Sequence, residues 1–230
     1  FGSDTTDDYF DGVIDEVRIE DVYRSADWIA LSYETQKAAA TVVTVGETEP
    51  TPGPLKKVYY SVGTETAVLY SGNASASNGI LTLSFSCSDS IGVGDEIQYG
   101  TDRYYIRKRN SSTEFLIQNS AANGGVPGDT NITFASSTIS IYRAFNSLSS
   151  AQAGASDASH LNTTDLVGGN FQLKFACYAD GEDNTNVVIS GWSTADSNNI
   201  KIYAPVDSTE VGRSQRHDGV WTEKAYRLVY

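Results

Sequence analysis

The sequence of 230 residues contains no methionine, only two histidines and only two cysteines. Because an initiator methionine is missing, we expect a processed chain or a segment of a longer protein. Neither His160 nor His217 lies in a nucleophile, zinc or phosphate motif. Asp218 follows His217 in a polar loop, which favours a loop held by Trp221 over a catalytic His–Asp pair. We therefore expect no enzymatic activity from this segment.

Basic residues are also scarce, since 16 Lys and Arg face 29 Asp and Glu and leave a net charge of -13. Nucleic-acid binding needs clustered cations that release counterions from phosphates, so nucleic acid is not an expected partner. The one basic run, residues 103–109, places charge on alternate strand positions around Tyr105 and predicts a solvated strand face rather than a nucleic-acid groove.

Long apolar runs are missing as well. No run approaches the roughly 18 residues that span a bilayer, so we expect no membrane insertion within this segment. No export signal is visible in it. The acidic composition, rich in Ser, Thr, Asn and Gly, favours an extracellular or cell-surface location.

The two cysteines, Cys87 and Cys177, lie in strand-like contexts. In an oxidising compartment they could form a disulfide, worth about 4 to 5 kcal/mol in the chain-entropy model for a loop of this length. The alternative is two separate buried thiols that act as small hydrophobes. Neither cysteine has a neighbour at zinc spacing.

Most of the chain after Leu55 reads as short strands separated by Gly, Asn, Asp and Ser turns, which predicts an all-β domain. The expected strands are residues 56–62, 67–72, 79–85, 95–100, 103–108, 114–119, 131–136, 137–145, 171–178, 186–192, 198–205 and 224–230.

Three features interrupt this pattern. A small meander or barrel is expected at about 91–118, inserted between neighbouring strands. A capping-box-like sequence at Ser149 to Gln152 predicts a short helix at about 149–160. From Phe171 onward the turns do not favour tight hairpins, which suits the first coils of a parallel β-helix.

The N-terminal residues have a different organisation. Val13, Val17 and Ile19 predict one face of a strand, and residues 24–27 carry a helix-start signal. Residues 38–54 form a Thr/Pro-rich linker that contains three of the five prolines. Within the linker, residues 41–45 are β-branched and could add as a strand to a sheet edge.

Two parts of the sequence resemble known protein families. Residues 9–36, YFDGVIDEVRIEDVYRSADWIALSYETQ, resemble the C-terminal end of laminin-G-like, concanavalin-A-like jelly rolls of prokaryotic surface proteins. The resemblance covers residues 1–36 and implies that 1–37 is a jelly-roll remnant of a strand pair plus a helix. Residues 143–205 and 213–228 resemble the N-terminal capping region of right-handed parallel β-helix proteins. That resemblance covers residues 56–230 and implies that 55–230 is a β-helix cap.

Metal and glycan sites are weaker expectations. The jelly-roll resemblance implies a structural calcium near Asp15, against an acid facing solvent. Asp180, Glu182 and Asp183 place hard oxygen ligands in one loop, which suits calcium or a plain acidic turn. Four glycosylation sequons begin at Asn73, Asn110, Asn131 and Asn162, all in turn-like contexts. The aromatic candidates for stacking on sugar rings, which could equally be core residues, are Tyr59, Tyr60, Tyr99, Tyr104, Tyr105 and Trp192.

Together these features suggest a non-catalytic structural or adhesive segment of a large secreted or cell-surface prokaryotic protein, able to assemble into a filament or sheath. The alternative is the non-catalytic N-terminal part of a carbohydrate-active β-helix enzyme with a glycan-binding jelly roll. Expected partners are further copies of the chain, missing parts of the parent protein, and glycans. Seven large apolar residues in the first 36 could not offset the entropy of ordering them, so a partner surface is expected there.

Overall fold

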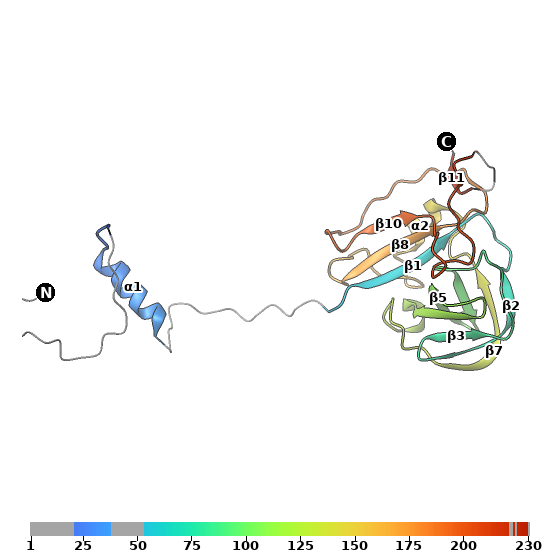
Figure 1. The fold of residues 1–230 in the computed structure, drawn as a ribbon, viewed down its shortest axis with the longest axis horizontal. Coiled ribbons are helices and arrows are strands. Elements are labelled where there is room, and N and C mark those ends of the chain that lie inside the picture. Colours follow the sequence, from blue (N-terminus) through green and yellow to red (C-terminus); the bar gives the residue numbers. More distant parts are fainter. Residues whose placement is uncertain (1–20, 38–52, 221–222, 224, 230) are drawn as a thin grey trace, which may run out of the picture. The chain divides into compact units, whose positions relative to one another are not determined.

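The computed structural model describes residues 21–37, 53–220, 223 and 225–229 (Figure 1). The chain divides into two units, residues 1–51 and 52–230, which are considered separately. The predicted strand at Val13 to Ile19, the calcium candidate Asp15 and the β-branched run 41–45 lie outside the described residues.

In the first unit, helix α1 spans Ala26–Gln36. It begins where the sequence predicts, because the Ser25 side chain accepts a hydrogen bond from the backbone N–H of Trp28 at 3.2 Å and caps the first turn. No residue of the helix is buried, and Trp28, Ile29 and Tyr33 all leave more than a third of their surface exposed.

The second unit contains a closed six-stranded antiparallel barrel with the order β2-β3-β6-β5-β4-β7. The predicted meander at 91–118 corresponds to three of these strands, but the barrel is twice that size because its neighbours close it. The strands are β2 (Tyr70–Ser77), β3 (Ile80–Leu83), β4 (Glu96–Tyr99), β5 (Asp102–Arg109), β6 (Glu114–Asn119) and β7 (Phe134–Tyr142).

Alternation of apolar residues explains the barrel interior. Leu81 and Leu83 of β3, like Ile139 and Ile141 of β7, are two positions apart and therefore point to the same side. The β2–β3 hairpin turns at Asn78 and Gly79, which have φ values of 48° and 79°. Asn-Gly is the pair that tolerates this left-handed turn, and the turn matches the twist of the strands.

Strand β5 departs from the expected solvated face. Tyr104 and Ile106 fill the barrel interior, Tyr105 points out of the barrel into a second core, and Arg109 is 4% exposed. A register shift between Ile106 and Lys108 breaks the alternation that the sequence suggests. The prediction of a solvated face was therefore wrong for most of this run, because one side of β5 faces the barrel interior, the second sheet covers Tyr105 on the other side, and loops cover Arg109.

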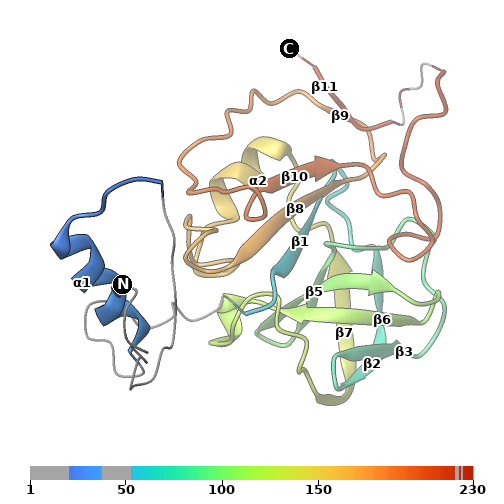
Figure 2. The same cartoon turned by 60° about the vertical axis from the view of Figure 1, so that its left-hand side comes forward.

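That second sheet is parallel and has the order β1-β8-β10. Its strands are β1 (Lys56–Val62), β8 (Phe171–Cys177) and β10 (Ile200–Tyr203), and Figure 2 shows them side by side next to the barrel. A shorter parallel pair joins β9 (Glu182–Asp183) to β11 (Arg227–Leu228), and a single parallel bridge joins Asp165 to Ser193. The strand predicted at 186–192 is not formed.

Among the described residues of the second unit, helical structure is limited to α2 (Leu148–Gly154) and a 3-10 turn, η1 (Ala121–Asn123). Ser147 caps α2 and forms a capping box with Ser150. The predicted helix is present, but it starts earlier than expected, because Ser147 rather than Ser149 is the cap. The described part of the chain is thus predominantly β, and none of its helices is long and apolar enough to cross a bilayer.

Candidate functional site

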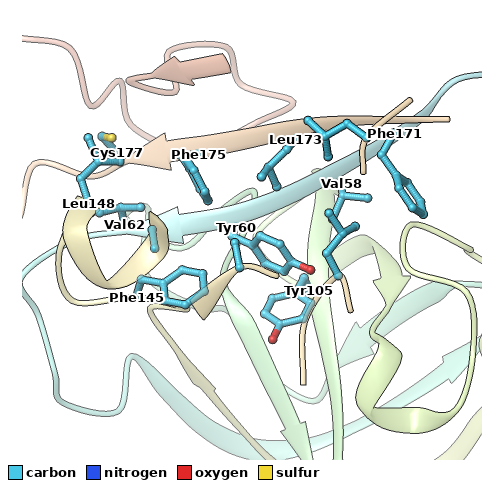
Figure 3. Packing of buried hydrophobic residues seen from close by; sticks show 14 residues of the cluster. Val58, Tyr60, Val62, Tyr105, Phe145, Leu148, Phe171, Leu173, Phe175 and Cys177 are labelled. Carbon is cyan, nitrogen blue, oxygen red and sulfur yellow. The ribbon is translucent and has the colours of Figure 1, made fainter. Parts of the chain in front are cut away.

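One face of the parallel sheet and the outer wall of the barrel share an apolar core (Figure 3). The Tyr60 ring of β1 meets the Tyr105 ring of β5 edge to face, with centroids 4.7 Å apart, and meets Phe145 at 5.8 Å. Such edge-to-face pairs add to the gain from burial. The residues buried in this core are Val58, Tyr60, Val62, Tyr105, Phe145, Leu148, Ala151, Ala155, Leu161, Leu166, Phe171, Leu173, Phe175 and Cys177.

A buried ion network also joins barrel and sheet. Arg143 follows β7, and its Nη1 donates to both carboxylate oxygens of Asp95 at 2.8 and 2.9 Å. Its Nε and Nη2 donate to Asp180, after β8, at 2.7 and 3.0 Å. The guanidinium also lies 3.6 Å from the ring centroid of Tyr178. Burial alone would lower the pKa of Arg143, but the carboxylates outweigh it and raise that pKa, so the arginine stays charged.

The three acids predicted to bind calcium are not assembled into a site. Asp180 is occupied by Arg143, whereas Glu182 pairs with Arg227 at 2.7 Å. Glu182 and Asp183 are adjacent in strand β9, so their side chains point to opposite faces. Among the residues described here, no group of three His, Cys, Asp or Glu is placed to hold a metal. Each acid of this loop thus has its own structural partner, as in a plain acidic turn, and calcium binding stays a prediction.

Asp183 instead supports the start of helix α2. Its Oδ2 accepts hydrogen bonds from the backbone N–H of Leu148 and the hydroxyl of Tyr226, both at 2.7 Å. Thr185 donates to Oδ1 from its hydroxyl at 2.6 Å. Burial raises the pKa of Asp183, but these hydrogen bonds outweigh it and lower the pKa below its ordinary value.

The candidate disulfide is not formed; both cysteines are free thiols, the alternative that the sequence left open. Cys87 lies at the barrel, where Arg109 donates to its Sγ at 3.4 Å. Cys177 ends β8 and belongs to the core shared with the sheet. The two thiols have different surroundings because strand pairing separates their elements.

His160 packs against the apolar core, and His217 takes part in a local turn. His160 stacks on Phe145, with ring centroids 4.7 Å apart, and its Nδ1 shares a hydrogen bond with the Ser159 hydroxyl at 3.0 Å. Burial lowers the pKa of His160. His217 accepts a hydrogen bond from the backbone N–H of Gly219 through Nδ1, within a local turn.

All four sequon asparagines are exposed. Asn73 lies within strand β2 rather than a turn and accepts a hydrogen bond from Thr138 at 3.0 Å. Asn110, Asn131 and Asn162 lie outside strands. Occupancy by glycans stays a prediction.

The aromatic candidates for glycan stacking divide by burial. Those that are buried and belong to a core are Tyr60, Tyr104 and Tyr105. Those that are partly exposed are Tyr59, Tyr99 and Trp192. The Tyr99 ring stacks on Phe134, with centroids 4.2 Å apart, and the Trp192 Nε1 donates a hydrogen bond to Gln152 at 2.9 Å. Of the three, Tyr59 is the one with a lysine, Lys174, over its ring.

Tyr59 belongs to a row of side chains on the outer face of the parallel sheet. The strand registers align Tyr59 with Lys174 and Lys174 with Lys201. Tyr203 lies two residues after Lys201, on the same face. The sequence signal was present in the alternation of KKVYYSV, FQLKFAC and IKIY, but the neighbours across strands are set only by the parallel register.

Comparison of the chain with protein-family models, curated proteins and solved structures found no match.

Proposed function

We propose that the second unit is the start of a parallel β-helix and that the chain is a non-catalytic structural or adhesive segment of a large secreted or cell-surface protein. One observation carries the architectural part. Three parallel pairings follow one another in the same order along two consecutive stretches of chain. In the first stretch the partners are Asp165, β8 and β9, and in the second they are Ser193, β10 and β11.

The spacing of these pairings supports a coil. Asp165 pairs with Ser193, 28 positions later, and Leu173 pairs with Ile200, 27 positions later. In a parallel β-helix each turn of the chain forms one coil with three strands. Each strand then pairs with the corresponding strand of the next coil, and the number of residues between paired positions is nearly constant. The third pairing, between Glu182 and Arg227, spans 45 positions, so the second coil carries an extra loop.

Stacking of side chains on one face of the sheet is consistent with this winding, with Tyr60 and Phe175 buried and Ile202, on the last strand, 44% exposed. Phe175 has Tyr60 as its partner on one side and Ile202 on the other. Strand β1 thus adds one further level, and the barrel is inserted between it and Phe145, which forms a parallel bridge to Val62. The barrel then covers the side of the sheet beyond β1, as a cap on a solenoid must, because an uncovered strand edge is a site for uncontrolled pairing.

Disulfide trapping tests the coil. In a chain with Cys87→Ser and Cys177→Ser, the pair Asp165→Cys and Ser193→Cys should cross-link under mild oxidation, because directly paired residues of adjacent strands lie within disulfide reach. The control moves the second cysteine one residue along, to Thr194→Cys, where the side chain points to the other side. If the control pair cross-links as fast as the matched pair, the coil register is wrong.

Two assays test the functional part. The purified chain should leave acidic and neutral polysaccharides at full length, and antibodies to the second unit should label intact source cells. Chain shortening that His217→Ala abolishes would contradict the absence of catalysis. Labelling that appears only after lysis would contradict the surface location.

The exposed residues of α1 support self-association or packing on other parts of the parent protein. Trp28, Ile29, Leu31 and Tyr33 are exposed, and full burial of each is worth about 1.5 to 3 kcal/mol. Hydrogen exchange of the α1 amides, measured at concentrations where sedimentation shows monomer and then assembly, tests this. Protection that is already complete in the monomer would contradict the requirement for a partner, whereas protection only in the assembly would favour a filament.

The alternative is the non-catalytic N-terminal part of a carbohydrate-active β-helix enzyme. The observation that favours it is the outer row with Tyr59, Lys174 and Lys201, whose chemistry suits a glycan. Both functions share the same architecture, so they differ in what the complete parent protein does to a polysaccharide.

A further inference from the structure

The outer face of the parallel sheet gathers cations and tyrosine rings in one place. Lys174 lies at the centre, with its Nζ 4.9 Å from the Tyr59 ring centroid and 5.9 Å from that of Tyr203. Lys201 also lies over the Tyr203 ring, with its Nζ 5.1 Å from the ring centroid. These distances are within the range of cation–π attraction, so rings and ammonium groups hold one another in an alternating row.

Further cations border this row. Lys57 is exposed two residues before Tyr59 on the same face of β1. Arg107 comes from β5 of the barrel and donates from Nη1 to the carbonyl of Gly128 at 2.9 Å. Burial raises the pKa of Tyr59 and lowers that of Lys174, and the charge of Arg107 is close enough to push both pKa values down. We call these residues together the lysine–tyrosine surface: Lys57, Tyr59, Arg107, Lys174, Lys201 and Tyr203.

The charge balance of the surface is opposite to that of the chain. It holds four of the 16 Lys and Arg residues of a protein whose net charge is -13. One acid, Glu210, lies beside it and accepts a hydrogen bond from the Tyr203 hydroxyl at 3.0 Å. Burial and the neighbouring charge of Lys201 lower the pKa of Lys174, which shows that the cations are close enough to repel one another. A bound anion would relieve that repulsion.

We propose that the lysine–tyrosine surface binds an anionic polysaccharide that contains uronic acids. Carboxylates of the sugar acids would pair with Lys174, Lys201 and Arg107. Tyr59 and Tyr203 pack partly on a small apolar cluster around Tyr178, so sugar rings would lie against the part of each tyrosine ring that stays exposed. Tyrosine suits this role because it offers an apolar body with a polar tip. The strong negative charge of the whole chain disfavours the dense phosphate charge of a nucleic acid more than the sparser charge of a polyuronate.

The inference rests on the outer face of the sheet and does not depend on the proposed structural function. Its test is binding of the full chain to polygalacturonate, with methyl-esterified polygalacturonate as the matched uncharged ligand. Binding should be measurable only to the charged polymer, and it should weaken as salt is raised. The double variant Lys174→Gln/Lys201→Gln should weaken binding between about twofold and thirtyfold, the range for loss of two ion pairs that water still reaches, since Lys174 is half-buried and Lys201 is exposed.

Controls separate loss of the site from loss of the fold. Lys201 is exposed, so Lys201→Gln alone should keep the wild-type circular dichroism and still weaken binding. Lys108→Gln removes the same charge from an exposed position of β5 outside the surface and should leave binding unchanged. Equal losses from Lys108→Gln and Lys201→Gln would reduce the effect to net charge and overturn the proposal.

Two other outcomes would also overturn it. Equal binding to the esterified polymer would show that the carboxylates are not recognised. Tighter binding to oligothymidylate than to polygalacturonate, sensitive to Lys174→Gln/Lys201→Gln, would assign the surface to nucleic acid instead.

Discussion

Replacing Arg143 with methionine should strongly destabilise the second unit. The arginine and Asp95 side chains are 1% and 0% exposed, so Arg143→Met leaves a fully buried carboxylate whose remaining partners include the backbone N–H of Gly92 at 2.9 Å. Removing one partner of a buried ion pair costs about 3 to 5 kcal/mol. Asp180 is 12% exposed and can turn to solvent, so it adds less to the loss.

The expected loss is large compared with the whole stability of a domain, about 5 to 15 kcal/mol. It corresponds to a fall in Tm of roughly 6 to 20 °C for a unit of this size. Urea denaturation of the full chain, followed by far-UV circular dichroism at pH 7, measures the free energy of unfolding directly. Adding Asp95→Asn to Arg143→Met should recover about 2 kcal/mol, because the uncompensated charge is then removed.

Arg103→Met is the matched control. Arg103 pairs with Glu96 and is 40% exposed, whereas Glu96 is 7% exposed. Glu96 keeps hydrogen bonds from Gln98 at 2.7 Å and Tyr105 at 3.3 Å when Arg103 is replaced, so this change should cost about 1 kcal/mol or less. If Arg143→Met costs no more than Arg103→Met, or if Asp95→Asn deepens the loss, the network does not hold barrel and sheet together as described.

Three further predictions concern a glycine, a histidine and the thiols. Gly94→Ala should cost about 2 to 5 kcal/mol, because Gly94 has a φ of 86° and a Cβ there would meet the backbone of β1. Gly100→Ala should cost about 1 kcal/mol, because Gly100 has a φ of 60° but a Cβ there would lie in open space. Equal midpoints of urea denaturation for the two variants would contradict this. Burial lowers the pKa of His160 in the folded chain, so between pH 5 and 7 the unfolded chain binds more protons than the folded chain. The free energy of unfolding should therefore rise from pH 5 to 7. His160→Phe should flatten that rise in thermal unfolding, and an unchanged profile would refute the assignment. Burial raises the pKa of Cys177 to about 12 and also raises that of Cys87. Alkylation without reductant, measured by intact mass, should therefore label two thiols in denaturant and leave Cys177 unlabelled in the native chain. No labelling in denaturant would show that the two cysteines form a disulfide.

Local features were predictable because their causes lie within a few residues. Ser25 caps α1 through the N–H of Trp28, three positions away, and Asn78-Gly79 turns the β2–β3 hairpin. Alternation of apolar residues likewise identified most strands and the all-β class. The same alternation failed at 186–192, where apolar residues have no neighbouring strand to pair with.

The candidate surfaces depended on contacts between residues far apart in the sequence. Charge and spacing suggested calcium at Asp180 and Asp183, but Arg143, 37 positions before Asp180, takes up the first of these carboxylates. Burial of Arg109 could not be foreseen either, because the loops that cover it come from both sides of its strand in the sequence. Composition shows which groups are available, and packing decides which of them meet.

The sequence by itself determined most of the strand-forming segments, the start of α1 and the small number of histidines and cysteines, since each follows from residue type and local spacing. Only the tertiary structure decided that Lys56–Val62 pairs in parallel with Phe171–Cys177, over a separation of 115 positions, and that six strands between them close into a barrel. The reason is physical: strand pairing uses backbone groups that every residue carries, so the choice of partner is made by the packing of whole faces. The row of Tyr59, Lys174 and Lys201 is a consequence of that choice.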